Sequence, residues 1–220
     1  MIKRYIILTS ALLLPLTAHS AKSNDIAYDS LDIGWTASSY ESDERGAFGN
    51  SDKENAGTFS IGGSVSATNN LAISGSVGVT VYDDASNGYY GNYGNYYYSY
   101  DNSTQTSFSI GLIPHFPLGN KVDLIIPLNL IYSDYEERGY SENDTGFSLG
   151  LGIRALVIPS LELGAQLTHT DIYSNDSQTF AASARWHISG LFSLALGVSN
   201  TDSTFYGKTT ASNFSMRFSF

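Results

Sequence analysis

Phe214-Ser215-Met216-Arg217-Phe218-Ser219-Phe220, the last seven residues of the chain, decide the fold. Apolar side chains occupy positions 214, 216, 218 and 220, and small or charged side chains occupy the positions between them. Side chains of a β-strand alternate between its two faces, so this stretch predicts a strand with one apolar and one polar face. The pattern continues to the final carboxylate, although chain ends usually fray. A strand that closes a barrel in lipid has to keep this alternation to its last residue.

The same alternation recurs along the chain. In residues 147–152, Phe-Ser-Leu-Gly-Leu-Gly, large apolar side chains alternate with serine and glycine. About ten such segments are long enough to cross a bilayer at a tilt. The predicted strands cover residues 26–40, 56–68, 71–83, 104–116, 121–133, 145–158, 160–172, 177–188, 191–201 and 208–220. A shift of one residue would turn the polar face toward lipid, so the register of each strand is strongly specified.

Short and long connections alternate between these strands. Thr68-Asn69-Asn70, 118–120, 158–160 and Ser189-Gly190 carry the residue types of tight turns. Longer polar connections are predicted near 41–55, 84–103, 134–144, 173–176 and 202–207. Short turns at one end and longer loops at the other are typical of membrane barrels, with the turns in the periplasm. The fold class we expect is therefore all-β, an antiparallel up-and-down transmembrane β-barrel of about ten strands.

The alternative is a soluble β-sandwich or a lipocalin-like barrel. Either fold needs large apolar side chains on the inner face of its sheets. Here the second face consists mostly of serine, glycine, threonine and alanine, which are too small to build a close-packed core. The membrane barrel is the better interpretation.

The N-terminal residues have the pattern of a secretory signal peptide. Lys3 and Arg4 are followed by the apolar stretch 6–16, and Ala18-His19-Ser20 offers small residues at the cleavage positions. We expect residues 1–20 to be removed and residues 21–220 to form one barrel domain. The alternative, a single helical anchor, requires a longer apolar core.

Composition excludes several classes of function. Without Lys3 and Arg4, 9 basic and 21 acidic residues remain, a net charge of −12. Nucleic acid is therefore not expected as a partner, because binding it requires a basic surface. The chain has no cysteine, which excludes disulfides, thiolate metal sites and a cysteine nucleophile. No cofactor motif or metal-ligand cluster is recognised.

Together, the leader, the alternation, the unequal connections and the terminal Phe220 resemble the small bacterial outer-membrane β-barrel proteins, the superfamily of OmpA-, OmpX- and Opa-like barrels. The resemblance covers nearly the whole chain and implies a location in the outer membrane. It implies that Phe218 and Phe220 form the signal read by the outer-membrane assembly machinery. Outer-membrane lipid and lipopolysaccharide are the other implied partners. The superfamily includes adhesins, pores and a few enzymes, so it specifies no activity.

Alternation directs a set of charged side chains into the lumen, where charges have to be paired or hydrated. These residues are Asp32, Asp123, Arg154, Glu162, Arg185 and Arg217, with His115 and His187. One interpretation is an ion-pair network that fills the lumen, with Arg154 and Glu162 on adjacent strands. The other is a narrow pore, favoured by small inward residues. These are Ser60, Gly62, Ser64, Ser148, Gly150 and Gly152. A barrel of this size permits both.

The predicted loop 84–103 is unusually rich in tyrosine. Its tyrosines are Tyr89, Tyr90, Tyr93, Tyr96, Tyr97, Tyr98 and Tyr100. Tyrosine beside glycine, serine and asparagine is the composition of adaptable binding surfaces. The loop is thus a candidate site for an extracellular ligand, and the alternative is a low-complexity surface segment.

Other predicted loops are acidic. The residues concerned are Glu41, Asp43, Glu44, Asp134, Glu136, Glu137, Glu142 and Asp144. Their oxygens could share Ca²⁺ or Mg²⁺ with lipopolysaccharide, but no ordered ligand spacing is present, so solvated surface charge is the simpler interpretation.

Catalysis finds little support. Asp83-Asp84 and His169-Thr170-Asp171 end two predicted strands at the loop end, where an Asp-polarised histidine could activate water. However, adjacent aspartates point to opposite faces, and His169 continues the lipid-facing row of its strand. His187-Ile188-Ser189 lies at the opposite end from the outer leaflet, where acyl transfer to lipid A would occur. We expect a non-enzymatic surface protein that acts in surface interaction or envelope integrity through its acidic and tyrosine-rich loops, with a small porin-like channel as the alternative.

Overall fold

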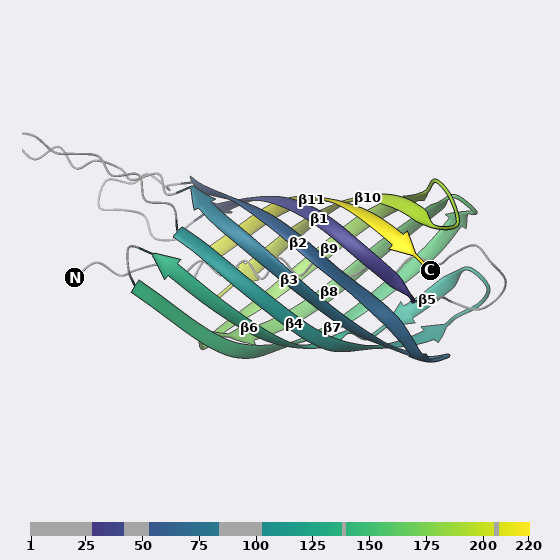
Figure 1. Cartoon of the computed structure of the whole chain (residues 1–220), viewed down its shortest axis with the longest axis horizontal. Coiled ribbons are helices and arrows are strands. Elements are labelled where there is room, and N and C mark those ends of the chain that lie inside the picture. Colours follow the sequence, from purple (N-terminus) through teal and green to yellow (C-terminus); the bar gives the residue numbers. More distant parts are fainter. Residues whose placement is uncertain (1–27, 42–52, 84–102, 138–139, 205–206) are drawn as a thin grey trace, which may run out of the picture.

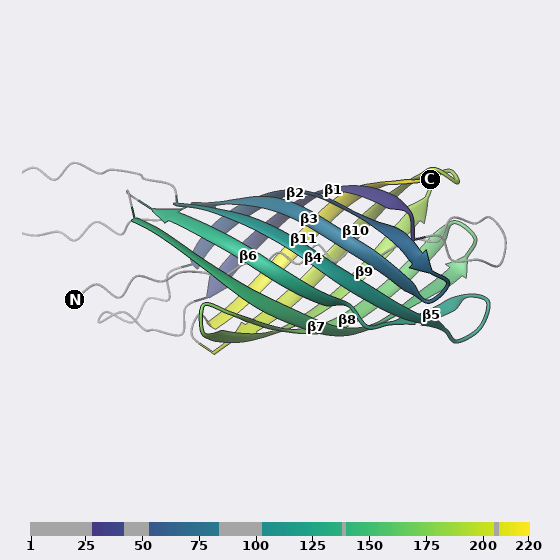
Figure 2. The same ribbon diagram turned by 60° about the horizontal axis from the view of Figure 1, so that its bottom comes forward.

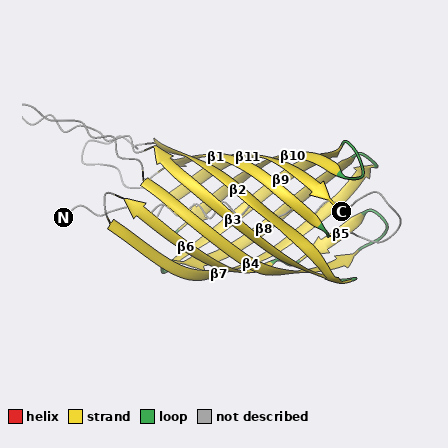
Figure 3. Cartoon of the chain, viewed as in Figure 1, coloured by secondary structure: helices red, strands yellow, loops and turns green. Residues whose placement is uncertain are grey.

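The strands wrap into one closed barrel, seen side-on in Figure 1 and turned by 60° in Figure 2. The computed structural model describes residues 28–41, 53–83, 103–137, 140–204 and 207–220. Their ordered elements are all strands (Figure 3). Within the described part of the chain, no helix is long and apolar enough to cross a bilayer.

Eleven strand segments follow one another in the sequence. They are β1 (Ser30–Glu41), β2 (Lys53–Thr68), β3 (Leu71–Asp83), β4 (Ser103–Pro117), β5 (Val122–Ile125), β6 (Leu128–Glu137), β7 (Tyr140–Ile158), β8 (Leu161–Ile172), β9 (Asn175–His187), β10 (Phe192–Ser203) and β11 (Gly207–Ser219). Each pairs antiparallel with its neighbours, and β1 pairs with β11. Because β5 and β6 together form one wall position between β4 and β7, the barrel has ten strands. The predicted fold is confirmed.

The wall position that β5 and β6 share is interrupted at Pro127. Proline has no N–H to donate to a sheet ladder. The flanking bonds remain: the Ile126 N–H donates to the Pro114 carbonyl at 2.9 Å, and the Gly150 N–H donates to the Pro127 carbonyl at 2.8 Å. The inward and outward alternation continues through the break, with Ile125 and Ile131 both buried.

The barrel has two different ends. Tight connections at 69–70, 118–121, 159–160 and 188–191 share one end with Ser30 and Phe220, and we call this the turn end (Figure 1). The connections that include 42–52 and 84–102 belong to the opposite end, the loop end. In outer-membrane barrels the short turns face the periplasm.

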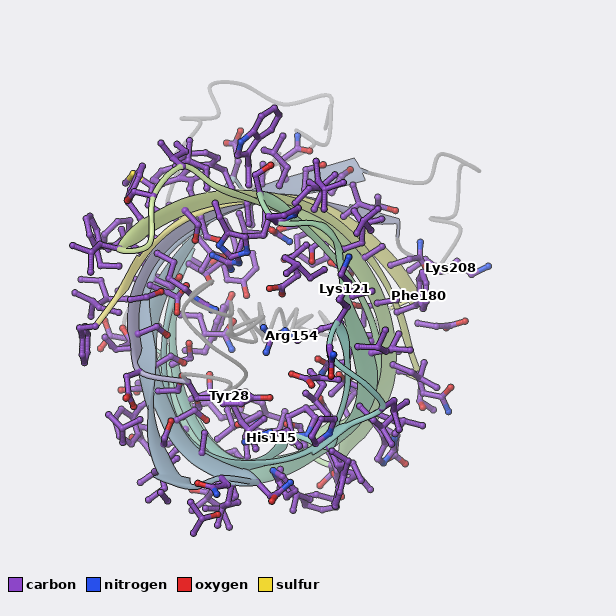
Figure 4. All side chains as sticks on the ribbon, turned by 90° about the vertical axis from the view of Figure 1, so that its right-hand side faces the viewer. Tyr28, His115, Lys121, Arg154, Phe180 and Lys208 are labelled. Carbon is purple, nitrogen blue, oxygen red and sulfur yellow. The ribbon has the colours of Figure 1, made fainter. Side chains whose placement is uncertain are left out.

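The outer wall is apolar and the inner wall is polar, as the alternation predicted. Phe108, Leu151 and Leu196 are exposed on the outside, whereas Ser148, Thr168 and Ser193 are buried. Figure 4, viewed along the barrel from the turn end, shows Arg154 and Tyr28 inside the ring and Phe180 outside it. Apolar side chains that would be unfavourable in water are thereby matched to lipid.

Two of the predicted longer connections are much shorter in the structure. Residues 134–137 extend β6 and residues 140–144 extend β7 as paired strands, with Asp134 opposite Asn143 and Asp144 opposite Ser133. The prediction failed because a wall that rises above the lipid no longer needs apolar outward side chains, so charged residues there do not mark the end of a strand.

The second exception is the predicted loop 173–176, which is a two-residue turn at Tyr173-Ser174 between β8 and β9. Both residues have positive φ, 54° and 55°. A two-residue hairpin of this type requires positive φ at both positions. The Tyr173 hydroxyl donates to the Ser133 carbonyl at 2.8 Å and so ties the turn to β6. Burial raises the pKa of Tyr173 to about 12, which keeps this donor protonated.

Candidate functional site

Six charged side chains converge inside the turn end of the barrel. They come from six strand segments: Asp32 from β1, Asp123 from β5, Arg154 from β7, Glu162 from β8, Arg185 from β9 and Arg217 from β11. All are predominantly buried, and Arg217 is fully buried at 0 % exposure. Alternation directs each of them inward because apolar neighbours on the same strand face lipid. We call these six residues the lumen charge cluster.

Arg154 and Glu162 form the best-defined pair of this cluster. Arg154 Nε donates to Glu162 Oε1 at 2.9 Å, and Nη2 donates to Oε2 at 3.1 Å. Both side chains are only 3 % exposed. Two parallel bonds between a guanidinium and a carboxylate are strong and geometrically specific. The sequence predicted that these two strands are adjacent, and the structure joins the side chains directly.

The carboxylate of Asp32 contacts two arginines. Arg217 Nε donates to Asp32 Oδ1 at 2.7 Å, and Arg185 Nη2 lies 3.8 Å from the same oxygen. Arg185 Nη1 also donates to Ser193 Oγ at 3.2 Å. One carboxylate therefore serves two guanidinium groups on this side of the lumen.

The two predicted histidines border the lumen charge cluster. His187 Nε2 lies 3.6 Å from Glu162 Oε2. His115 is fully buried and stacks on Tyr28, with ring centroids 3.8 Å apart. The Tyr28 hydroxyl donates to Asp123 Oδ2 at 3.4 Å, and the guanidinium carbon of Arg154 lies 5.5 Å from the centre of the Tyr28 ring. Tyr28 thus connects β4, β5 and β7 across the lumen.

A second network lies inside the loop end, and sequence reasoning missed it. Tyr40, Tyr82 and Tyr135 are buried there, with ring centroids 6.1 Å apart between Tyr82 and each of the other two. The Tyr82 hydroxyl donates to Gln105, whose amide donates to Ser133 Oγ at 2.6 Å. Period-2 alternation could have predicted it, because these tyrosines occupy the same face of their strands as neighbouring serine and threonine residues.

The inner wall also carries small side chains, as predicted for Ser60, Ser64 and Ser148, which are buried. Glycines do not simply leave free space here. A Cβ built on Gly150 would lie 2.7 Å from Gln166 Nε2, and one on Gly152 would lie 3.0 Å from Ile125 Cγ1. Larger inward side chains from neighbouring strands therefore occupy the space beside these two glycines.

Other predicted site residues have different positions. The seven tyrosines of the 84–103 loop, Asp43, Glu44 and Asp84 lie outside the described residues. Phe218 and Phe220 both lie at the turn end on the outer wall, and Phe220 is 72 % exposed. Among the described residues, no group of three or more candidate ligands could hold a metal ion.

His169 is on the outer wall, not in the lumen. Its side chain is 44 % exposed, and its Nε2 lies 3.5 Å from Asp176 Oδ1, an even more exposed group. Asp171 faces Asp176 across the β8–β9 ladder. The lipid-side position predicted for His169 agrees with this arrangement.

Comparison with known proteins decides the family. The family described as "Outer membrane protein beta-barrel domain" matches residues 6–187. The chain belongs to this family. As an outer membrane protein beta-barrel domain it resides in the bacterial outer membrane, and lipid surrounds its apolar wall. Among curated proteins, no relative matches the chain.

Solved structures share the fold of this outer membrane protein beta-barrel domain. The beta domain of the Bordetella autotransporter BrkA has a TM-score of 0.58 at 12 % identity, covering 88 % of this chain and 100 % of that one. An outer membrane channel from Pseudomonas putida F1 has a TM-score of 0.54 at 13 % identity, covering 90 % and 97 %. The translocator domain of the Neisseria meningitidis autotransporter NalP has a TM-score of 0.54 at 10 % identity, covering 87 % and 88 %. At these identities the likeness concerns the fold alone.

Proposed function

We propose that the chain is a non-enzymatic surface interaction protein and that its barrel is a closed anchor. The observation that carries this proposal is the pair of networks inside the barrel. The lumen charge cluster lies inside the turn end, and Tyr40, Tyr82 and Tyr135 lie inside the loop end. All of these residues are buried except Asp32, whose side chain is 14 % exposed. Hydrogen-bonded side chains at both ends leave the exterior of the barrel and its loop end as the functional surfaces.

The loop end has the charge and composition of a binding surface. Asp134, Glu142 and Asp144 lie on the extended ends of β6 and β7, above the apolar belt. The tyrosine-rich segment 84–103 joins β3 to β4 at the same end. An extracellular ligand with basic and apolar groups would match both features. Lipopolysaccharide phosphates would need an intervening Ca²⁺ or Mg²⁺ to approach the acidic groups.

Single-channel conductance tests the closed anchor. The inserted and folded protein should give no discrete current steps in a planar bilayer. The matched control is the double variant Arg154→Ala and Glu162→Ala. It removes the doubly hydrogen-bonded ion pair of the lumen charge cluster and should produce small current steps. Discrete steps from the unaltered protein, with a size that depends on Arg154 or Glu162, would favour the porin-like channel instead.

Surface attachment tests the binding role. Replacing the seven tyrosines of the 84–103 loop by serine should abolish attachment of cells to their target surface, while the amount of assembled barrel stays the same. A matched variant with Asp134→Asn, Glu136→Gln and Glu142→Gln separates charge from tyrosine contact. Attachment that survives the tyrosine replacements would refute the tyrosine loop as the binding surface.

A further inference from the structure

The lumen charge cluster follows an alternating order of sign around the turn end. Asp123 on β5 faces Arg154 on β7, Glu162 on β8 faces Arg185 on β9, and Arg217 on β11 faces Asp32 on β1. From β5 to β1, the signs of the charges read minus, plus, minus, plus, then plus, minus. Within this arc the alternation is interrupted at β10, which lies between the two arginines of β9 and β11, and β2, β3 and β4 contribute no residue to the cluster.

Ser193 occupies the position on β10 where alternation would place a carboxylate. It is buried, faces Arg217 across the ladder, and accepts a hydrogen bond from Arg185 at 3.2 Å. A serine hydroxyl carries no charge to balance either guanidinium. Asp32 is the acidic group that Arg185 and Arg217 share, at 3.8 Å and 2.7 Å.

Several donors of this arginine pair are unused. Arg185 Nε and both Nη atoms of Arg217 are buried and have no hydrogen-bond partner among the described residues. A buried donor without a partner is costly, and a buried charge without a full counter-charge is more so. The unused donors come from the two strands that flank Ser193, so a single bound group could satisfy donors from both sides.

We propose that a small oxyanion of the phosphate class binds between Arg185 and Arg217 beside Ser193 and supplies a negative charge next to β10. Guanidinium forks match the oxygens of phosphate in geometry and charge. Arg185, Ser193 and Arg217 are buried on the inner wall at the turn end, so the ligand we propose is a solute of the periplasm and not a lipid headgroup outside the wall. This inference is independent of the proposed surface role, because a closed barrel can hold a structural anion.

The test places a negative charge beside the two arginines from within the chain. Ser193→Asp places a carboxylate at the position that the anion would fill, and Ser193→Asn is the neutral control of similar size. Thermal unfolding of the full protein in vesicles is followed as sodium phosphate replaces sodium chloride at constant ionic strength. The unfolding midpoint of the unaltered protein should rise with phosphate concentration, as expected for a ligand that binds the native state.

The two variants should differ in how their unfolding midpoints respond to phosphate. Ser193→Asn should keep a phosphate-dependent midpoint, whereas Ser193→Asp should have a higher midpoint in chloride and no dependence on phosphate. A midpoint of the unaltered protein that does not respond to phosphate would overturn the proposal and assign water to these donors. A phosphate response retained in Ser193→Asp would overturn it too, because binding would then occur elsewhere. If Ser193→Asp does not assemble, Arg217→Lys replaces it, and an undiminished phosphate response in that variant refutes the site.

Discussion

Arg154 and Glu162 illustrate what a membrane barrel requires of a single residue. Their pair is nearly removed from water, so each charge is stabilised by its partner and not by solvent. Desolvation makes such a pair a modest contributor to stability while it is intact. Removing one partner is different, because the remaining charge stays buried without compensation.

Glu162→Gln should therefore lower the free energy of unfolding by about 3–5 kcal/mol, the typical cost of breaking a buried ion pair. The measurement is urea unfolding in vesicles, followed by the fluorescence of Trp35 and Trp186 on the outer wall. The double variant Arg154→Met and Glu162→Gln should recover most of the loss. Equal destabilisation in the single and double variants would contradict the pairing.

At the residue scale, the sequence predicted which face of the barrel wall a side chain occupies better than it predicted which other side chains it contacts. Period-2 alternation assigns each side chain to lipid or lumen, so the inward position of the lumen charge cluster follows from parity alone. Which charges meet depends on the stagger between strands. The bulge between Leu156 and Ile158, for example, shifts the β7–β8 register beside Arg154. The alternation of side chains in the sequence does not reveal where such a bulge occurs. The tyrosines of the loop end were missed because the aromatic residues were not sorted by parity.

At the element scale, length was the less predictable property. Most strand boundaries agree within a few residues, because lipid demands an apolar row of fixed height. Above the lipid that demand ends, so the upper parts of β6 and β7 carry acidic residues and still pair. The break at Pro127 was also missed, because a proline preserves the alternation and removes only a donor.

The β8–β9 turn gives a prediction for one element. Ser174 is exposed and has a positive φ of 55°, a conformation that costs a residue with a Cβ about 1–2 kcal/mol. Ser174→Gly should raise the free energy of unfolding by about 1 kcal/mol, measured by urea unfolding. Tyr173→Gly is the informative contrast: it relieves the same strain and also loses the hydroxyl contact with β6, so it should stabilise less or destabilise. A larger gain from Tyr173→Gly would mean that the contact contributes little.

At the scale of the whole molecule, Phe220 separates assembly from stability. Its side chain is 72 % exposed, and its N–H donates to the Asp29 carbonyl at 3.2 Å. Deleting Phe220 should reduce the amount of barrel assembled by cells, because the terminal aromatic is the proposed assembly signal. The same truncated chain, refolded in vesicles, should unfold within about 1 kcal/mol of the full chain, since one exposed side chain contributes little. Normal assembly in cells would refute the signal.

The pairing of β1 with β11 sets the order of events during biogenesis. Ser30 meets Ser219, so the first strand to leave the ribosome finds its second neighbour only after the last strand has been made. Contacts between such distant parts of a chain form slowly. Until then the backbone of β1 offers an open edge to any other strand in the periplasm. The barrel therefore cannot close until β11 has been made, and β1 keeps an unpaired edge until then.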